Sequence, residues 1–423
     1  MSSTPLYLFR TRRFAPLFGT QFLGAFNDNL YKNTLAVALT FEARAWTTLP
    51  SGLLAPLIAA LFILPFFLFS GLSGEIADRI DKARLARIVK VWEMGMMGIA
   101  LVGFGLHLFW LLLVVVFGMG MHSTLFGPIK YALIPQHMHP HELIGANALI
   151  ESGTFGAILL GTIMGGALAT LPHGGFIAAM CALFLATLGY LSSRAIPPAP
   201  PPHRDDPFRL GFWAHTTGAI KLALKDREVF IGIIAISWFW LYGALLLSQF
   251  PSLVKETLQG SEGIVTLILA LFTVGIGVGS AVCESLSHHH VRYRLVIIGA
   301  VGMGIAGIDF AYGVGTFMPD GVLTHQGAFW HIVLDIVGLG FFGGLYSVPL
   351  YARIQERSDP DARSRIIAAN NILNALFMVA ISLVTMLFLS WGYTMGWLFG
   401  GVAVMTLGVG GVVLMHAKRS TLK

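Results

Sequence analysis

The chain has 423 residues, of which 56% are apolar and only 11% are charged. Soluble globular proteins have about 45–50% apolar and about 25% charged residues, so this composition excludes a water-soluble enzyme. One bilayer-spanning helix needs about 20 apolar residues, and this chain has enough for roughly twelve. Its two cysteines, Cys181 and Cys283, lie far apart in apolar runs, which excludes a disulfide framework. The net charge of +6 indicates basic cytoplasmic loops rather than nucleic-acid binding.

Long apolar runs follow one another along the whole chain. The first run is too long for a cleaved signal peptide, and runs of this length are typical of helices rather than of barrel strands. We predict an all-α membrane protein with twelve transmembrane helices. The expected spans are residues 14–41, 53–73, 86–106, 108–131, 142–170, 174–195, 228–250, 262–285, 294–316, 327–350, 365–390 and 394–416.

The distribution of basic residues predicts the orientation. If both termini are cytoplasmic, 24 of the 27 Lys and Arg residues fall in inside segments. Only Arg44 and Lys255 fall outside, and Lys32 lies within the first span. Cytoplasmic loops carry the excess of Lys and Arg, so we predict that both termini are cytoplasmic.

A proline run at residues 197–202 opens the longest inside connection. Such a run predicts a stiff, solvated spacer. It divides the chain into an N-terminal six-helix lobe (1–196), a cytoplasmic linker (197–227) and a C-terminal six-helix lobe (228–423). Two six-helix repeats are typical of secondary transporters that work by alternating access.

The loop after the second span, Gly74 to Arg84, resembles the cytoplasmic loop signature of the major facilitator superfamily, with Asp81 in place of its second glycine. Gly74 permits a close helix contact, and Asp78 can lie at the positive N-terminal end of a helix in the other half. We therefore predict that Gly74, Asp78 and Arg79 form a conformational gate. The alternative is an ordinary basic loop.

The first span has an unusual polar stripe. Gln21, Asp28 and Lys32 fall within about 40° of each other on a helix, and Asn29 flanks them. A charge at the bilayer centre costs about 2.5–3.5 kcal/mol on insertion scales, so such residues usually have a function. We interpret the stripe as substrate-binding. The alternative is that Asp28 and Lys32 only neutralise each other one turn apart.

Other spans also contain polar residues. Gly127 and Pro128 are expected to loosen the fourth span, which would put Lys130 either in a cavity or at the cytoplasmic end, as a snorkelling lysine. The amides of the fifth and eleventh spans either bind substrate or join helices. The further candidate substrate-binding residues are Lys130, Tyr131, Asn147, Glu151, Asn370 and Asn374.

Four segments look like bacterial lysophospholipid transporters of the major facilitator superfamily. The segments are 21–29, Gly-Pro-Ile-Lys-Tyr at 127–131, Ala-Asn-Ala-Leu-Ile-Glu at 146–151, and Val-Pro-Leu at 348–350 followed by Gln-Glu-Arg at 355–357. The form of residues 26–33 is similar to the transporter module that is often fused to acyltransferase and acyl-ACP synthetase domains. The likeness extends from Gln21 to the last span.

This resemblance implies transport of lysophosphatidylethanolamine and lysophosphatidylglycerol from the outer to the inner leaflet of a bacterial cytoplasmic membrane. It implies no cofactor, no ion gradient and a cytoplasmic acyltransferase or acyl-ACP synthetase partner, and we expect a monomer. A carboxylate and a lysine one turn apart can bind an ammonium and a phosphate. We expect the head group to lie against the N-terminal lobe and the acyl chain against the apolar C-terminal half.

Two other functions stay open at this point. A proton-coupled exporter or small-metabolite transporter has the same fold, and Asp28 and Glu151 could equally carry protons. A lipid-modifying membrane enzyme is disfavoured, because GxSxG, HxxxxD and the ATP-binding P-loop are all missing from the sequence.

Several remaining patterns are expected to have ordinary roles. The histidines at 137–141 and 288–290 predict solvated loops rather than metal sites. The GxGxxG stretches at 302–307 and 338–343 lie in apolar runs and predict helix packing. His331 and Asp335, one turn apart, predict either a proton site or a hydrogen-bonded pair in the outer half.

Overall fold

The structure is a computed structural model that describes residues 5–41, 46–47, 51–201, 211–287 and 292–420. These residues contain helices and no strand, and twelve of the helices have more than 20 residues. The predicted all-α fold with twelve long helices is therefore confirmed. The histidines at 288–290 lie outside the described residues.

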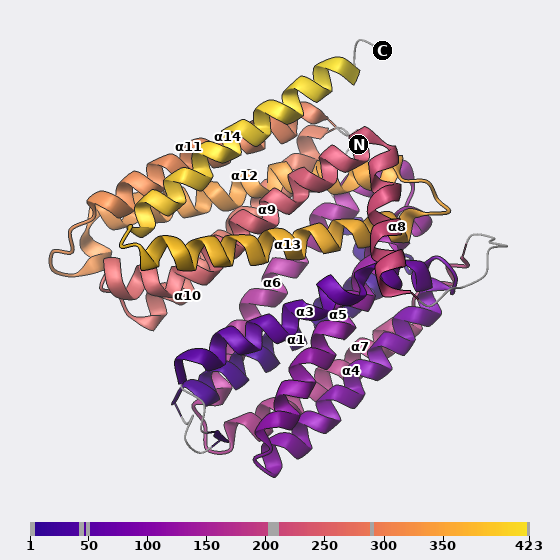
Figure 1. Ribbon diagram of the computed structural model, residues 1–423, viewed down its shortest axis with the longest axis horizontal. Helices are drawn as coiled ribbons and strands as arrows, with labels where there is room; N and C mark the ends of the chain where they lie inside the picture. Colours follow the sequence, from indigo (N-terminus) through magenta and orange to yellow (C-terminus); the bar gives the residue numbers. More distant parts are fainter. Residues whose placement is uncertain (1–4, 42–45, 48–50, 202–210, 288–291, 421–423) are drawn as a thin grey trace. The chain divides into compact units, whose positions relative to one another are not determined.

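The chain divides into two compact units (Figure 1). The first unit comprises Met1–His139, Gly153–Lys225 and Ser358–Ile372, and the second comprises Pro140–Ser152, Asp226–Arg357 and Leu373–Lys423. The helices α6 and α13 each contribute residues to both units. The division into two lobes at residues 197–227 stays a prediction.

The helices have the following bounds. Those of the first half are α1 (Ala15–Phe41), α3 (Ser51–Ala77), α4 (Lys82–Gly105), α5 (Phe109–His137), α6 (Leu143–Ala169) and α7 (Gly174–Arg194). Those that follow are α8 (Phe212–Lys225), α9 (Arg227–Ser252), α10 (Glu262–Ser287), α11 (Tyr293–Thr316), α12 (Gly327–Arg357), α13 (Arg363–Ser390) and α14 (Met395–Ser420). Short helical turns are η1 (Pro5–Arg10), η2 (Pro140–Glu142), η3 (Leu253–Thr257) and η4 (Leu323–His325).

Eleven helices of the described residues are long and apolar enough to cross a membrane. The helix α1 is not among them, although it has 27 residues. Asp28, Lys32 and several amides give α1 a lower hydropathy than its neighbours. The one long helix with weak membrane character is thus the helix that carries the polar stripe.

Glycines allow close helix packing in the first unit. A Cβ added at Gly161 would lie 2.5 Å from the carbonyl oxygen of Phe26, and one added at Gly165 would lie 2.6 Å from that of Leu30. The C-terminal part of α6 therefore lies directly on the backbone of α1. Tyr31 anchors the other side of α1, because its hydroxyl donates to the Leu112 carbonyl at 2.9 Å.

In the second unit, α11 lies beside α14 on one side and packs against α12 (Figure 1). The predicted packing role of the GxGxxG stretches is confirmed here. A Cβ added at Gly302 would collide with the Phe342 ring at 2.2 Å, and one at Gly340 would lie 2.4 Å from the Phe272 carbonyl oxygen. These glycines bring α10 and α11 into close contact with α12.

The described part of the proline run makes two backbone contacts that the sequence did not predict. Ala199 donates its backbone N–H to Asp81 at 2.8 Å, and its carbonyl accepts from Lys82 N at 3.0 Å. The proline run thus docks on the start of α4. The helix α8 follows and packs on α3, with the backbone nitrogen of Thr216 2.6 Å from a Cβ added at Gly71.

Large apolar side chains cover much of the outer surface of both units. Trp110 and Phe184 are exposed in the first unit, and Ile305, Leu334 and Met386 in the second. Exposed apolar surface on this scale marks contact with another apolar phase. Together with the eleven apolar helices it identifies a multi-pass membrane protein.

Candidate functional site

Asp28 lies at the centre of a polar cluster inside the first unit. It is 7% exposed, and Ser123 of α5 donates its hydroxyl hydrogen to the Asp28 carboxylate. The imidazole Nδ1 of His122 lies 3.9 Å from the same carboxylate. A buried charge needs such partners, because each unsatisfied group in an apolar interior loses its hydration. Asp28 is thus held by two residues of α5.

His122 connects Asp28 to a second buried carboxylate, that of Glu93 on α4. The Nε2 atom of His122 lies 3.0 Å from Glu93 Oε2, and Lys90 Nζ lies 2.5 Å from that oxygen. Asn27 donates to the other oxygen of Glu93 at 2.6 Å. The side chains of Lys90 and Glu93 are both 0% exposed.

This Lys90–Glu93–His122 network was not predicted. Lys90 was counted among the basic residues of the inside segments, although the expected span 86–106 contains it; it lies in the third turn of α4 and is wholly buried. The i,i+3 spacing of Lys90 and Glu93 within an apolar run was the available signal, because two charges so placed in a span usually pair. The sequence around His122 gave no such signal, because the partners of His122 come from other helices.

The remaining residues of the predicted stripe have different surroundings. Gln21 is buried and accepts from the Thr154 hydroxyl at 3.2 Å. Lys32 is half-buried, with its Nζ 3.9 Å from the centroid of the Phe62 ring on α3. Asn29 donates to the carbonyl of Ala25 in its own helix at 2.8 Å, so it caps a backbone group rather than extending the charged cluster.

Lys130 and Tyr131 follow the Gly-Pro pair on α5. The helix continues through Pro128 and Pro135 to His137. Lys130 is half-buried with its Nζ 4.5 Å from the centroid of the Tyr131 ring, and Tyr131 is buried. Lys130 therefore lies about two turns before the end of the helix.

Asn370 belongs to the first unit, as does its neighbour Asn371. The side-chain amide of Asn370 is buried at 1% exposure and has no hydrogen-bond partner among the described residues. The Asn371 amide nitrogen lies against Gly127, where an added Cβ would be 2.4 Å away. A buried amide without a hydrogen-bond partner costs free energy. The Asn370 amide is therefore an unsatisfied polar group about two turns after the start of α13.

The other predicted residues belong to the second unit. Asn147 on α6 exchanges two hydrogen bonds with Gln355 on α12, at 2.7 and 3.1 Å. Asn374 accepts from Ser237 at 2.9 Å, and Glu151 is fully buried. The Asn147 and Asn374 amides therefore join helices, which is one of the two roles expected for them.

Two of the three predicted gate residues, Gly74 and Asp78, meet the start of α13 within the first unit. Asp78 accepts from Ser364 N at 3.1 Å and from Arg365 Nε at 3.1 Å, at the helix end where backbone N–H groups lack partners. Burial raises the pKa of the Asp78 carboxyl above its usual range, while the hydrogen bonds from Ser364 and Arg365 oppose the rise. The expected position of Asp78 at a helix N-terminus is confirmed.

The other residues of this loop hold it in shape. Arg79 pairs with Glu75 at 2.6 Å, and Glu75 lies 3.7 Å from Arg365. Asp81 replaces the family glycine and accepts from Arg84 N at 2.8 Å, so it caps α4. The departure from the family signature therefore has a structural role.

We expect Gly74→Ala to destabilise the protein by about 1–3 kcal/mol, a usual cost of overpacking. A Cβ there would lie 2.6 Å from Ala368 Cβ and 2.8 Å from Arg365 Cα, so α3 and α13 would have to separate. Gly98→Ala is the matched control, since a Cβ at Gly98 meets nothing within 4 Å. Thermal unfolding of both variants in detergent measures the difference, and equal melting temperatures would contradict this contact.

The sequence profile of the Major Facilitator Superfamily matches residues 17–382. Among curated proteins, this chain is similar to the lysophospholipid transporter LplT of Klebsiella pneumoniae subsp. pneumoniae, with 28% identity over 347 residues, covering 80% of this chain and 78% of that protein. It is also similar to the lysophospholipid transporter LplT of Citrobacter koseri, with 25% identity over 397 residues, covering 92% of this chain and 89% of that protein.

Solved structures share the fold at low sequence identity. The human organic anion transporter MFSD10 has a TM-score of 0.73 and 16% identity, covering 96% of this chain and 97% of that chain. The superfamily transporter FucP in its outward conformation has a TM-score of 0.73 and 11% identity, covering 95% of this chain and 97% of that chain. The profile covers most of the chain, and the chain therefore belongs to the Major Facilitator Superfamily and is a membrane transporter rather than an enzyme.

Proposed function

We propose that this transporter moves lysophospholipids, lysophosphatidylethanolamine and lysophosphatidylglycerol among them, from the outer to the inner leaflet of a bacterial cytoplasmic membrane. The observation that carries the proposal is the similarity, over 80% of this chain, to a protein named lysophospholipid transporter LplT. The transport cycle is alternating access, and a separate cytoplasmic acyltransferase or acyl-ACP synthetase re-acylates the product. The transporter works as a monomer with both termini inside.

The head group binds to the polar stripe of α1 and to the polar residues of α5. The buried Asp28 carboxylate is suited to a substrate ammonium, and the half-buried Lys32 to a phosphate. The Lys32 ammonium lies 3.9 Å from the centroid of the Phe62 ring and interacts electrostatically with Asp28, and a substrate phosphate would add a second anionic partner. The unsatisfied amide of Asn370 is a further donor and acceptor for the substrate. The acyl chain lies against the apolar C-terminal half.

Binding to purified protein tests this substrate class. Lysophosphatidylethanolamine should raise the melting temperature, because a ligand that binds only the folded state stabilises it. Glycerophosphoethanolamine, which has the head group without the acyl chain, should have little effect at equal concentration. Mass spectrometry should recover the lipid unchanged. A stronger shift with the water-soluble compound would contradict the proposal.

We also propose that Asp78 holds the cytoplasmic side shut through the start of α13. Removing the cap by Asp78→Ala costs about 1 kcal/mol, so an open state should become about fivefold more populated. The measurement is maleimide labelling of Ser364→Cys in a chain without Cys181 and Cys283, because Ser364 is fully buried. Asp81→Ala, which removes the cap of α4, is the control. Unchanged labelling in Asp78→Ala would contradict the gate.

A second candidate function rests on the His122 contacts. An imidazole between the carboxylates of Asp28 and Glu93, at 3.9 and 3.0 Å, is an arrangement that can pass a proton. This arrangement favours a proton-coupled exporter or small-metabolite transporter. The two candidates differ in their need for a proton gradient.

A further inference from the structure

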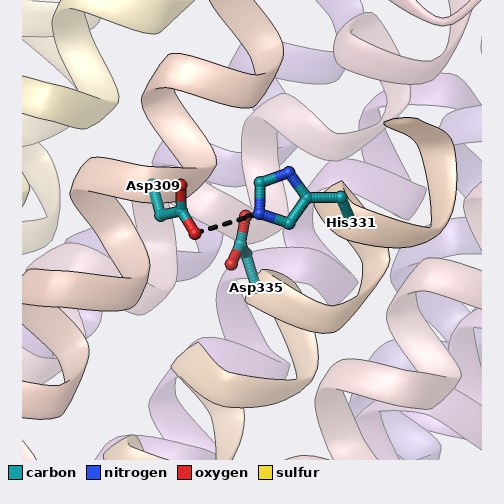
Figure 2. A group of neighbouring side chains, drawn as sticks. All are labelled: Asp309, His331 and Asp335. Atoms are coloured by element: carbon teal, nitrogen blue, oxygen red, sulfur yellow. Dashed lines mark hydrogen bonds and ion pairs between the residues drawn. The ribbon is translucent and has the colours of Figure 1, made fainter. Parts of the chain in front are cut away.

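A cluster of three titratable side chains lies in the second unit, away from the polar stripe of α1 along the chain. Asp309 comes from α11, and His331 and Asp335 lie one turn apart on α12 (Figure 2). His331 Nε2 is 3.0 Å from Asp309 Oδ2 and 4.0 Å from Asp335 Oδ2. The imidazole thus pairs with a residue of another helix, a partner that the sequence did not indicate.

Asp335 is the inner member of this cluster. It is only 7% exposed, and its Oδ2 accepts no hydrogen bond from the described residues. By contrast, the side chains of His331 and Asp309 are about half exposed, at 47% and 49%. A buried carboxylate oxygen without a donor costs free energy, so a cationic donor brought by a ligand would be favourable there.

A cavity of about 460 Å³ adjoins the cluster and lies between α10, α11 and α12. Asp309 and Asp335 line one part of it, and the rest is lined by apolar residues and glycines. Among the lining residues, Ile305 and Leu334 are 61% and 67% exposed, so the cavity opens on the apolar outer surface of the unit. Its size is typical of small-molecule sites. We call this cavity, with Asp309, His331 and Asp335, the outer groove.

We propose that the outer groove binds a single-chain amphiphile with an ammonium head group. The ammonium has three donors and lies between the two carboxylates, and the acyl chain occupies the apolar part. An apolar groove with an acidic end is complementary to such a molecule in both charge and hydrophobicity. The outer groove is thus a substrate-receiving site that prefers lysophosphatidylethanolamine to lysophosphatidylglycerol, an identification that rests on the proposed function.

The position along the helices agrees with a receiving role. Asp309 lies two turns before the end of α11 at Thr316, and His331 lies one turn after the start of α12 at Gly327. In the orientation predicted from the basic residues, this end of the helices faces outside. Lysophospholipids awaiting transport are in the outer leaflet, where the mouth of the groove would be.

A divalent cation is the competing occupant. One imidazole and two carboxylates, with ligand atoms within 4.8 Å of one another, are a set that could hold a metal ion. A metal site, however, needs further oxygen or nitrogen ligands rather than an apolar cavity beside it. The amphiphile accounts for both the carboxylates and the cavity.

The test is photolabelling of the full-length protein by lysophosphatidylethanolamine with a diazirine in its acyl chain. Peptides that contain Ile305 and Leu334 should be labelled. Labelling should fall about tenfold for Asp335→Asn and Asp309→Asn, the usual effect of losing one charge-assisted hydrogen bond. Asp320→Asn, an exposed carboxylate in the loop between α11 and α12, is the matched control and should label as the unaltered protein does.

A matched ligand tests whether the positive charge of the ammonium is needed for labelling. The N-acetylated lipid has the same acyl chain and phosphate without the positive charge, and it should label the groove as weakly as the lysophosphatidylglycerol analogue. Equal labelling by the charged and acetylated lipids would overturn the proposal, because the groove would then contact any acyl chain. Stoichiometric Mn²⁺ or Zn²⁺ binding that requires Asp335, without charge-selective labelling, would also overturn it.

The outcomes separate this inference from the proposed function. If the groove is labelled with charge selectivity but the protein moves no lysophospholipid, the site stands and the transport proposal fails. If lysophosphatidylethanolamine is transported equally by Asp335→Asn and the unaltered protein, and labelling is unchanged, the transport proposal stands and the receiving site fails.

Discussion

Asp28→Asn should lower the initial rate of lysophosphatidylethanolamine transport by about tenfold or more, because one charge-assisted hydrogen bond contributes about 1.5–3 kcal/mol. The asparagine can still accept from the Ser123 hydroxyl, so the fold around α1 should persist. What the variant loses is the negative charge that we assign to the substrate ammonium. The measurement is lipid protection in proteoliposomes that contain equal amounts of folded protein.

Two comparisons make this prediction specific. Lys32→Gln should reduce transport of lysophosphatidylethanolamine and lysophosphatidylglycerol alike, since both have a phosphate, whereas Asp28→Asn should affect the ethanolamine lipid more. Lys255→Gln, an exposed lysine beyond α9, is the control for loss of a positive charge. Normal transport of both lipids by well-folded Asp28→Asn would rule out this role for the stripe.

Glu93→Gln should destabilise the protein by about 3–5 kcal/mol, the usual cost of breaking a buried ion pair by removing one partner. The change leaves the Lys90 ammonium, which is fully buried, without its counter-charge at 2.5 Å. The side-chain oxygen of the glutamine can still accept the hydrogen bond from Asn27. The loss of stability should therefore come from the missing negative charge rather than from a change in side-chain shape. Thermal unfolding in detergent, referred to the unaltered protein, measures it.

The double variant Lys90→Met/Glu93→Gln is the control for this interpretation. Removing both charges should recover most of the lost stability, because no uncompensated charge remains in the interior. Gly24 and Gly189 leave the space that the Lys90 side chain occupies, because a Cβ added at these glycines would lie 2.7 and 3.2 Å from Lys90 Nζ. The methionine fills this space. A double variant as unstable as Glu93→Gln would show that the pair has another role.

The helices themselves were predictable because apolar length is a local property of the chain. The run at 174–195 became α7 at Gly174–Arg194, and the polar character of α1 was visible in Asp28 and Lys32. The position of Asp78 at a helix N-terminus was also predictable, because the loop at Gly74–Arg84 resembles a known signature and a carboxylate is stabilised at the positive end of a helix. The start of α13 at Arg363 supplied that helix end.

The polar network around His122 could not be predicted, because its members come from three helices. Glu93 and Lys90 lie on α4, Asn27 on α1 and His122 on α5, so their meeting depends on how these helices pack. Lys90 was counted with the inside basic residues because it lies near a basic stretch. Its i,i+3 spacing to Glu93 indicated a pair within the span, and its burial shows that it belongs to the interior.

The helix α8 was missed for a related reason. Its sequence follows a proline run and is short, so it was included in the linker, but Ala219 and Ala223 are buried and Trp213 is exposed.

Asn147 is a residue that was noticed but whose partner was not. It was correctly singled out as polar, yet its reciprocal hydrogen bonds with Gln355 became visible only when α6 and α12 were in place.

The most direct test of lysophospholipid transport is a protection measurement in proteoliposomes. Fluorescent lysophosphatidylethanolamine is added to the outer leaflet, and its loss of accessibility to an external quencher is followed with and without a proton gradient. We predict protection that depends on the protein, needs no gradient and is strongly reduced by Asp28→Asn. Absence of protection by folded protein under both conditions would contradict lysophospholipid transport, and protection only with a gradient would favour the proton-coupled transporter.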